Sequence, residues 1–591
     1  MKKDMRCSLA ALLAVAAVPG CAPSPSAPPA VVESWVEGTL RQMTLDEKVG
    51  QVLCPAVSAA VADQGADALA DVRTNVQTYH VGSYIIYGYP GRSPASVASL
   101  ISTMQGYAKV PLLITADLEG GAGHQFEGAT RFPRAMAIGA TGDPQYAYDA
   151  GDFTGREGRA MGVNVNFYPV VDVNNNPENP IINIRSFGES PARVAELGAA
   201  YVRGAQTAGI IATAKHFPGH GDTSIDSHLQ LPVLDFDRAR LDAVELPPFI
   251  AAIQAGVKAV MTAHITLPQI DPVAGLPASL SPAITTSLLR NELGFKELVV
   301  TDALTMQAIT QNFGSDQAPI MAIKAGADIA LIPADIPEAF AAVKSAVQSG
   351  EIPRTQLDAA VRRLLNAKAW AGLDVRRTPD LGQIGNRVGT AAARAKAQEI
   401  IEHALTLVKD DRNSIPLALS PDEEVLLLNF LDSGGGDLTD DSGRAFQSEF
   451  VTRHLRTLYL EVTPGTTASE AEAILHQSQA YGTVVVSCFL RLAAYRGSLS
   501  LSDVQQNLLR ALALRSGALV FVLFGSPYLL NFIPELPSYA LAYEFYPGAE
   551  AAMVRAIFGE IPFQGRLPVT VGSFPAGFGL EKPGVWAVER Q

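Results

Sequence analysis

Short apolar runs alternate with longer helix-compatible segments from residue 49 to about residue 333, and this alternation constrains the fold more than any other feature. Segments such as Pro191–Ala208 and Leu246–Gly256 are alanine-rich with helical spacing, whereas the runs between them are rich in β-branched residues. The expected strands are Val49–Val57, Val81–Tyr87, Val110–Asp117, Val163–Val173, Gly209–His216, Ala259–His264, Leu298–Asp302 and Ala327–Ile332. Strands that alternate with helices pair in parallel, and eight such units predict a (β/α)₈ barrel, a TIM-like fold.

Polar side chains support the barrel over its rival, a doubly wound open sheet, which would place a glycine-rich phosphate loop after the first strand. No such loop follows the first run. Polar residues instead end five of the predicted strands: Asp117, Asp172, Lys215, His216, His264 and Asp302. Barrel enzymes carry their catalytic groups at the carboxyl ends of the strands, because those ends converge around one pocket.

A second α/β domain is expected after the barrel. The chain becomes polar and rich in proline and glycine between Thr378 and Gly389, and a helical segment, Ala391–Leu405, follows. Further expected strands are Glu424–Phe430, Leu455–Val462, Thr483–Phe489, Leu519–Phe524, Tyr539–Tyr543 and Pro568–Val571. Helical segments separate several of them, which predicts a three-layer sandwich. The expected division is a catalytic barrel at 32–378, a linker with a bridging helix at 379–400 and the sandwich at 401–591.

The first residues form a predicted targeting segment. Lys2, Lys3 and Arg6 precede an apolar stretch, Leu9–Val18, that is too short to span a bilayer comfortably. The following Val-Pro-Gly-Cys resembles a bacterial lipoprotein box, which would place a lipid on Cys21; ordinary cleavage and release is the alternative. This predicts a signal peptide at 1–21, a flexible tether at 22–31 and export to the bacterial cell envelope, either periplasmic or attached to the outer membrane.

Charge and cysteine content restrict the partners. The net charge of −14 argues against nucleic acid, and it leaves a lipid anchor as the expected membrane contact. Cys54 and Cys488, which lie after the targeting segment, occur singly in apolar runs and are expected to be buried free thiols. Neither cysteine has metal-ligand spacing, and the sequence predicts no metal or organic cofactor.

The stretch from Lys215 to His228, KHFPGHGDTSIDSH, carries three histidines and two aspartates on a loop broken by proline and glycine. Asp226 could orient the His228 imidazole for proton transfer, although an Asp-x-His pair by itself is common. His216 and Lys215 come first, at the strand end, where they would face the pocket as hydrogen-bond donors. His220 and Asp222 are expected to brace the loop.

Asp302 ends a buried apolar run, where a carboxylate loses hydration unless a cation or hydrogen-bond donor faces it. Aspartate is also a preferred N-cap, which is the structural alternative at this position. The barrel context favours a catalytic role for Asp302.

These motifs together resemble glycoside hydrolase family 3, in its β-N-acetylglucosaminidase branch. The resemblance rests on the Lys215–His228 loop and on LVVTDAL around Asp302. Further matching stretches are Asp117–Gly121, Phe132–Ala140, Asn166–Val173, Asn174–Pro180 and Arg185–Gly188. It covers the barrel and, more loosely, the second domain.

The resemblance implies a retaining exo-β-N-acetylglucosaminidase that acts on peptidoglycan fragments or chito-oligosaccharides, and it implies a role for each matching residue. Asp302 would be the nucleophile and His228 the general acid/base, with Asp226 as its partner. The positions expected to bind the terminal sugar are Asp117, Arg185, Lys215, His216, Gln125 and His264. Where the branch carries arginines after Asp-x-Glu-Gly-Gly, this chain has Ala122 and Gln125, so Gln125 would bind a hydroxyl without bidentate, charge-assisted geometry.

The sequence leaves three alternative functions to compare with this one. A β-glucosidase or β-xylosidase of the same family would take a glutamate acid/base from the second domain, which the Asp226/His228 pair argues against. A glycoside phosphorylase is compatible with a histidine acid/base, because no second carboxylate would repel phosphate. A lipid-anchored sugar-binding protein without activity would have lost Asp302 or His228, and both are present.

Overall fold

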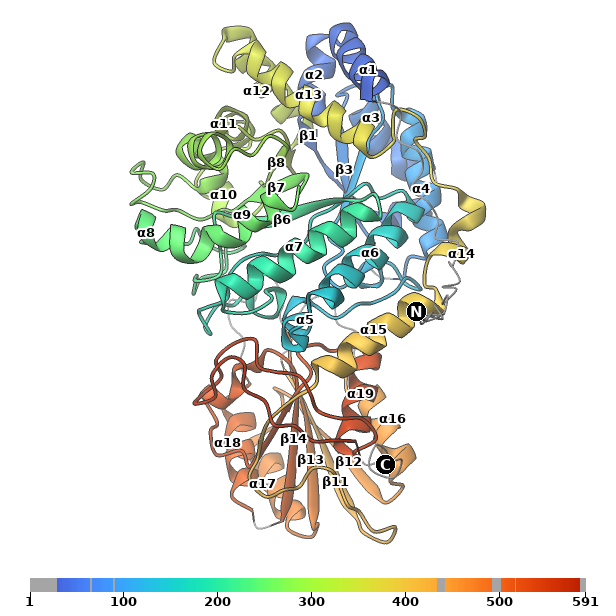
Figure 1. Ribbon diagram of the computed structural model, residues 1–591, viewed down its shortest axis with the longest axis vertical. Coiled ribbons are helices and arrows are strands. Elements are labelled where there is room, and N and C mark those ends of the chain that lie inside the picture. The colour runs from blue at the N-terminus through green and yellow to red at the C-terminus, as the bar shows by residue number, and fades with distance from the viewer. Residues whose placement is uncertain are drawn as a thin grey trace, which may run out of the picture.

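Eight parallel strand positions close into a barrel in the N-terminal half of the computed structural model, which describes residues 29–63, 66–88, 91–432, 442–491, 501–515 and 517–584 (Figure 1). The first position is split by Pro55 into β1 and β2. The strands are β1 (Leu53–Cys54), β2 (Ala56–Ser58), β3 (Ser83–Tyr87), β4 (Leu113–Ala116), β5 (Val165–Asn166), β6 (Ile211–Phe217), β7 (Ala259–Thr262), β8 (Leu298–Thr301) and β9 (Ala330–Leu331). β2 to β8 pair in sequence order. β1 pairs in parallel with β9, and a bridge between Val300 and Ile329 joins β8 to that end. The predicted barrel is thereby confirmed.

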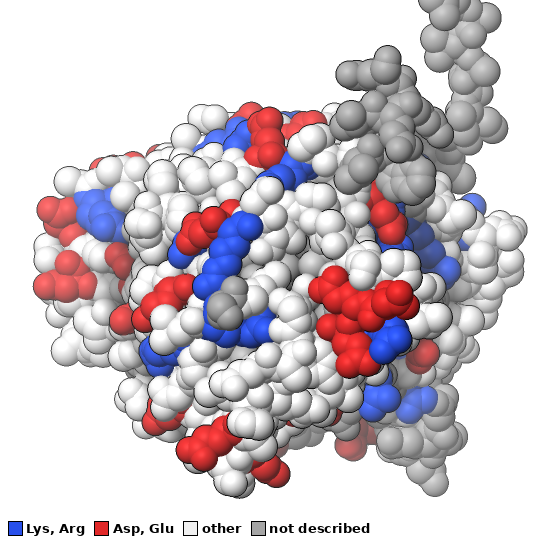
Figure 2. All heavy atoms as spheres, turned by 90° about the horizontal axis from the view of Figure 1, so that it is seen from below, with Lys and Arg blue, Asp and Glu red and all other residues white. Residues whose placement is uncertain are grey.

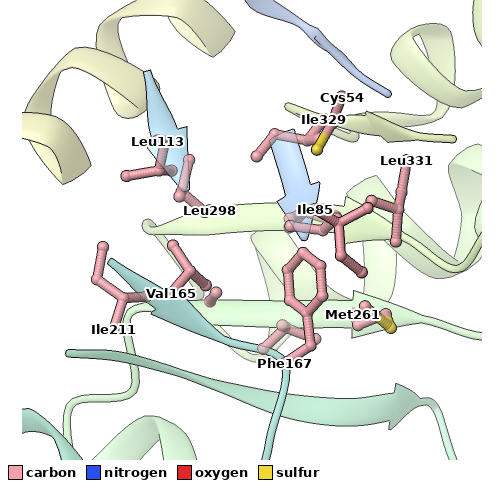
Figure 3. Close-up of a cluster of buried hydrophobic side chains, with 14 of the residues drawn as sticks. Cys54, Ile85, Leu113, Val165, Phe167, Ile211, Met261, Leu298, Ile329 and Leu331 are labelled. Carbon is pink, nitrogen blue, oxygen red and sulfur yellow. The ribbon is translucent and has the colours of Figure 1, made fainter. Parts of the chain in front are cut away.

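Helices surround the barrel and apolar side chains fill it. The helices of this half are α1 (Pro29–Gln42), α2 (Leu45–Gln51), α3 (Ala70–Gln77), α4 (Pro94–Tyr107), α5 (Ala135–Thr141), α6 (Pro144–Met161), α7 (Pro191–Thr207), α8 (Arg238–Arg240), α9 (Leu246–Gln254), α10 (Gln307–Thr310), α11 (Gln317–Ala325), α12 (Ile336–Ser349), α13 (Arg354–Trp370) and α14 (Ile384–Arg387). Figure 3 shows Ile85, Val165, Phe167, Ile211 and Leu298 from different barrel segments meeting in the interior. All five are buried, so the barrel interior is a packed core and not a channel.

Several predicted strands are shorter than expected, and two of them have a clear local cause. Val49–Gln51 belongs to α2 because Thr44 and Glu47 form a capping box that starts a helix there. Within Val163–Val173 the structure has only β5 and a bridge at Val170, since Pro169 lacks the N–H that a continuous ladder needs.

The predicted signal peptide with Cys21, and residues 22–28 of the tether, lie outside the described residues. α1 begins at Pro29, so the last three residues of the expected tether, 29–31, are helical. Within the part of the chain that the structure describes, no helix combines the length and the apolarity needed to cross a membrane.

The second domain is a six-stranded mixed sheet between two helical layers, in agreement with the predicted sandwich (Figure 1). The strand order is β10-β15-β14-β13-β11-β12, and only β10 is antiparallel to its neighbour. The strands are β10 (Thr406–Asp410), β11 (Val425–Leu431), β12 (Thr457–Val462), β13 (Thr483–Leu490), β14 (Ala518–Gly525) and β15 (Ser538–Leu541). The helices are α15 (Ala391–Ala404), α16 (Arg444–Arg453), α17 (Ala468–Ser478), α18 (Asp503–Ala513) and α19 (Pro547–Ile557). Figure 1 places α17 and α18 on one face and α16 and α19 on the other.

Sequence reasoning missed β10, and it wrongly expected a strand at Pro568–Val571. β10 follows α15 directly, without a turn signal to separate them. The 568–571 segment serves the domain interface instead, since the Pro568 carbonyl accepts the backbone N–H of Glu189 at 3.1 Å.

The carboxyl ends of β14 and β15 face the barrel. After β14, the Tyr528 hydroxyl accepts a hydrogen bond from Asn174 Nδ2 at 2.7 Å. After β15, Glu544 accepts the backbone N–H of Arg134 at 3.1 Å. The barrel helix α5 also places Met136 and Ala137 in the hydrophobic core of the second domain. The loops at the carboxyl edges of both sheets therefore meet at one interface.

Among the described residues, charged side chains at the end of the molecule formed by the second domain are of both signs (Figure 2). Figure 2 looks onto that end and shows acidic and basic side chains in small neighbouring clusters on a mostly uncharged surface. Within the described residues in this view, nothing resembles the basic stripe that binds phosphate backbones.

Candidate active site

A pocket of about 590 Å³ opens at the carboxyl ends of the barrel strands. Its wall combines apolar side chains, including Ile85, Tyr87, Met261 and Leu331, with charged and polar ones. The polar lining is Asp117, Glu119, His124, Gln125, Arg134, Arg185, Lys215, His216, His220, Ser227, His228, Asp302 and Thr305. The pocket therefore brings together Asp302, His228 and five of the six predicted sugar-binding residues.

Lys215 and Arg185 form one ionic cluster with two carboxylates. Lys215 Nζ lies 3.0 Å from Asp117 Oδ1 and 2.8 Å from Glu119 Oε1. Arg185 donates to both oxygens of Glu119, at 2.9 and 2.8 Å. Burial opposes the charge on Glu119, but Arg185 and Lys215 outweigh it and hold the pKa of Glu119 well below its usual range. The cluster is a rigid array of donors and acceptors, which suits a polyhydroxylated ligand.

His216 is fixed by Asp172, a fully buried carboxylate at the end of the preceding strand position. The His216 ring donates from Nδ1 to Asp172 Oδ2 at 2.7 Å, and the His216 backbone N–H also points to this carboxylate. The backbone N–H of His220 donates to Asp172 Oδ1 at 2.8 Å. The Asp172 carboxylate thus fixes the orientation of the His216 ring and also the backbone of the loop that follows β6.

The middle of the Lys215–His228 loop is internally braced. The His220 ring lies 3.0 Å from the Thr223 hydroxyl and 2.9 Å from the Ser227 hydroxyl. Burial and the neighbouring His216 lower the pKa of His220 to about 4, so its ring is neutral at physiological pH. Asp222 pairs with Arg240 at 3.0 Å. Both residues brace the loop in this structure.

His228 stands at the end of this loop with Asp226 directly behind it. His228 Nδ1 lies 2.8 Å from Asp226 Oδ1, and the His228 backbone N–H donates to the same oxygen at 2.9 Å. The side chain of His228 is 23% exposed, whereas that of Asp226 is 0% exposed. The backbone carbonyl of His228 accepts the Gln307 N–H at 3.3 Å, which ties the loop to the segment after Asp302. His228 therefore lines the pocket while Asp226 holds the Nδ1 side of its ring.

Asp302 follows β8 directly and lines the pocket beside three imidazoles. Its Oδ1 accepts the Ala303 N–H at 2.8 Å. Burial works against ionisation of Asp302, but His264, His216 and His228, together with the Ala303 N–H, outweigh it and hold the pKa of Asp302 well below its usual range. The carboxylate is ionised at any physiological pH.

The structure places two of the predicted sugar-binding residues differently from the rest. His264 is buried and is not part of the pocket lining; its ring lies 2.7 Å from Ser279 Oγ and 3.0 Å from the Ala303 carbonyl oxygen. It positions the backbone next to Asp302. Gln125 lines the pocket, and its Oε1 accepts the Gly88 N–H at 3.2 Å, which leaves its amide NH₂ group as the part able to donate to a ligand.

Sequence reasoning assigned no site role to Glu119, Arg134 or Glu544. Glu119 belongs to the quoted Asp-Leu-Glu-Gly-Gly stretch and is spaced two residues from Asp117, which is a usable signal. Arg134 lies in another quoted stretch, without a distinguishing pattern. Glu544 comes from the second domain, and only the fold brings it to the barrel.

The remaining candidates carry no site. Cys54 and Cys488 are buried free thiols, and burial raises the pKa of Cys54 to about 12. Within the described ranges, no group of three or more histidine, cysteine, aspartate or glutamate side chains is arranged to hold a metal ion.

A (β/α)₈ barrel with a carboxylate after one strand, a histidine–aspartate pair on a loop and a cluster of ionic donors and acceptors is compatible with an enzyme that acts on glycosidic bonds. The glycosyl hydrolase family 3 N terminal domain matches residues 44–367. The chain belongs to this family and is a glycoside hydrolase.

Relatives and solved structures extend the similarity beyond the barrel to about nine-tenths of the chain. The chain is 32% identical over 556 residues to a beta-N-acetylglucosaminidase/beta-glucosidase of Cellulomonas fimi, covering 91% of this chain and 95% of that one. A solved family 3 beta-N-acetylglucosaminidase from Paenibacillus sp. str. FPU-7 superposes with a TM-score of 0.81 at 34% identity, covering 90% of this chain and 99% of that one. A solved beta-glucoside phosphorylase has the same TM-score at 26% identity, covering 92% and 97%.

Proposed function

We propose that the chain is a retaining exo-β-N-acetylglucosaminidase that removes terminal β-linked N-acetylglucosamine from oligosaccharides. The observation that carries the proposal is that His228, paired with the buried Asp226, lines the same pocket as Asp302. The names of the Cellulomonas and Paenibacillus relatives support this sugar specificity.

In the first step, protonated His228 donates its Nε2 proton to the glycosidic oxygen while Asp302 attacks the anomeric carbon. The bond to the leaving sugar breaks, and a covalent glycosyl-aspartate forms. Asp226 stabilises the protonated ring, because it accepts the Nδ1–H at 2.8 Å. The low pKa of Asp302 keeps the nucleophile ionised before the attack.

In the second step, neutral His228 accepts a proton from water through Nε2, and the water attacks the anomeric carbon from the face that the first product has left. The Asp302–sugar bond breaks and the configuration is retained. The cluster of Lys215, Asp117, Glu119 and Arg185 holds the hydroxyl groups of the terminal sugar throughout.

The proposed substrates are chito-oligosaccharides or peptidoglycan fragments in the cell envelope of a bacterium. The predicted signal peptide supports this location, with Cys21 as the proposed lipid attachment site. Acyl labelling of the full chain expressed in a bacterium, compared with a Cys21→Ala variant, tests the anchor: label in both proteins would refute it.

The direct test of the function is hydrolysis of aryl β-N-acetylglucosaminide and aryl β-glucoside by the full chain, measured side by side. We expect a clear preference for the N-acetylglucosaminide. A preference for the glucoside would show that the chain is a glucosidase. Equal rates would show that it accepts both sugars.

A phosphorylase is the second candidate, favoured by one observation. Apart from Asp302, the carboxylates around the pocket are either paired with cations, as Asp117 and Glu119 are, or shielded, as Asp226 is behind His228. Inorganic phosphate could therefore approach the anomeric carbon in place of water. Reaction rates and products, measured in phosphate buffer and in a phosphate-free buffer, distinguish hydrolysis from phosphorolysis. Formation of a sugar 1-phosphate would establish phosphorolysis.

A further inference from the structure

Glu544 of the second domain lies against two arginines of the barrel, one of which lines the active-site pocket. Glu544 follows β15 and has 1% of its side chain exposed. Its Oε2 accepts the Arg134 backbone N–H at 3.1 Å, and its Oε1 accepts the Phe545 backbone N–H at 3.0 Å. Its carboxylate also lies 3.9 Å from Arg134 Nε and from Arg131 Nη2. The carboxylate is thus anchored by backbone donors from both domains.

The two residues after Glu544, Phe545 and Tyr546, also contact these arginines. The Arg134 guanidinium lies over the Phe545 ring at 5.3 Å, and that of Arg131 lies over the Tyr546 ring at 5.5 Å. Aromatic faces attract cations and fix the plane of a guanidinium group. Three consecutive residues of the second domain therefore set the orientation of both arginines.

Some guanidinium N–H groups of Arg131 and Arg134 have no hydrogen-bond acceptor in this arrangement of the described residues. At 3.9 Å the Glu544 carboxylate attracts the guanidinium groups without accepting a hydrogen bond from them. The Nε atoms of Arg131 and Arg134 are buried and have no hydrogen-bond partner among the described residues. Buried donors without a partner are rare because their lost hydration is not replaced. Nε of Arg134 has almost no exposed surface, but the residue is 9% exposed and lines the pocket, so a bound ligand would meet the Nη groups of the same guanidinium.

His124 is a neutral imidazole in this part of the pocket. It lines the pocket next to Arg134, and burial with the charges of Arg134 and Arg131 lowers the pKa of His124 to about 3. Two guanidinium groups share one carboxylate, and the neighbouring imidazole is neutral. Guanidinium groups are donors only, so this part of the pocket can bind an acceptor oxygen.

We propose that Arg134 is a further substrate-binding residue that donates to an acceptor oxygen of the bound sugar, and that Glu544 is its positioning residue. The second domain thereby completes the active site without contributing a group to the chemistry. This inference deepens the proposed function and rests on it only for the identity of the sugar.

The test compares the wild-type chain with Arg134→Ala, Glu544→Gln and the double variant, using whichever aryl β-glycoside the wild type cleaves best. Glu189→Gln is the matched control, because Glu189 also crosses the domain interface, through Thr570, but does not line the pocket. Thermal unfolding of each variant is recorded beside kcat and KM.

We expect Arg134→Ala to lower kcat/KM about tenfold, mainly through KM, and Glu544→Gln to lower it by roughly threefold to tenfold in the same parameter. The double variant should resemble Arg134→Ala alone, because Glu544 acts through Arg134. Glu189→Gln should keep wild-type kinetics, and Arg134→Lys should recover part of the loss. If Glu544→Gln does not fold, Glu544→Asp takes its place.

Unchanged kcat/KM in Arg134→Ala would overturn the proposal, and so would effects of Arg134→Ala and Glu544→Gln that multiply in the double variant. Equal losses in Glu189→Gln and Glu544→Gln would reduce Glu544 to a contact that only joins the domains. A wild type that prefers the glucoside would refute the proposed specificity, while the same variants measured on the glucoside would still decide the role of Arg134.

Discussion

Asp226 Oδ1 accepts two hydrogen bonds from His228, one from ring Nδ1 at 2.8 Å and one from the backbone N–H at 2.9 Å. The two contacts fix the tautomer and the orientation of the ring relative to its own backbone. A histidine held in this way needs no further residue to direct Nε2, so the pair can sit on a loop away from the barrel strands. This geometry supports the assignment of His228 as the proton-transfer group.

Replacement of Asp302 by asparagine should lower hydrolysis of the aryl substrate by at least about 10³-fold, because the amide cannot attack the anomeric carbon. The matched change is Asp316→Asn, an aspartate after α10 that is not in the pocket lining. Initial rates of both purified variants provide the measurement. Turnover of Asp302→Asn at the wild-type rate would remove Asp302 from the mechanism.

Replacement of His228 by alanine should affect substrates according to their leaving groups. A natural disaccharide needs protonation of its leaving oxygen and should lose about 10²–10⁴ in rate, whereas an activated aryl glycoside should lose less in the first step. The comparison uses kcat/KM for both substrates. Equal losses on the two would argue against the acid role of His228.

Replacement of Gly221 by alanine should displace the loop that carries His228. A Cβ atom at this position would lie 1.8 Å from the Val173 carbonyl oxygen, so the loop must move away from the barrel. We expect about a tenfold loss of kcat/KM with a lower midpoint of thermal unfolding. Gly256→Ala, in an open position, controls for the added methyl group, although its positive φ of 81° carries some strain of its own. A fully active Gly221→Ala variant would contradict the described loop packing.

Acidification should destabilise the folded chain through His220. Its pKa is about 4 in the folded state and near 6.5 when unfolded, so between these values the unfolded state binds more protons and stability falls as the pH falls. From pH 7 to pH 5 this loss is about 2 kcal/mol for His220 alone. Urea unfolding of the wild type and of His220→Gln at both pH values measures it. The variant should show a smaller drop in stability between the two pH values, and an equal drop would exclude His220 as the cause.

Periodicity and local motifs were enough to predict the barrel, because strands buried on both faces are continuous apolar runs and the polar residues that end them mark the functional face. The same reasoning located Asp302, His228 and Lys215 in one pocket. It could not separate His264 from these, because a histidine at a strand end has the same sequence signature whether its ring faces the pocket or the Ser279 hydroxyl.

Contacts between the domains were beyond sequence reasoning. Glu544 and Arg134 are about 410 residues apart, and no local pattern predicts which loop of a sandwich meets which loop of a barrel. The strand β10 was missed for a local reason, because it follows α15 without a turn signal.

The pairing of β1 with β9 has a consequence for how the chain reaches its native state. Leu53 finds its partner Ala330 only after about 280 further residues exist, so the ring cannot close while the chain is short. At a synthesis rate of 5–20 residues per second, this leaves the edges of the growing sheet unpaired for roughly 15 to 55 seconds. An open parallel edge is a site for misassembly, so the chain must be shielded from its neighbours over that interval.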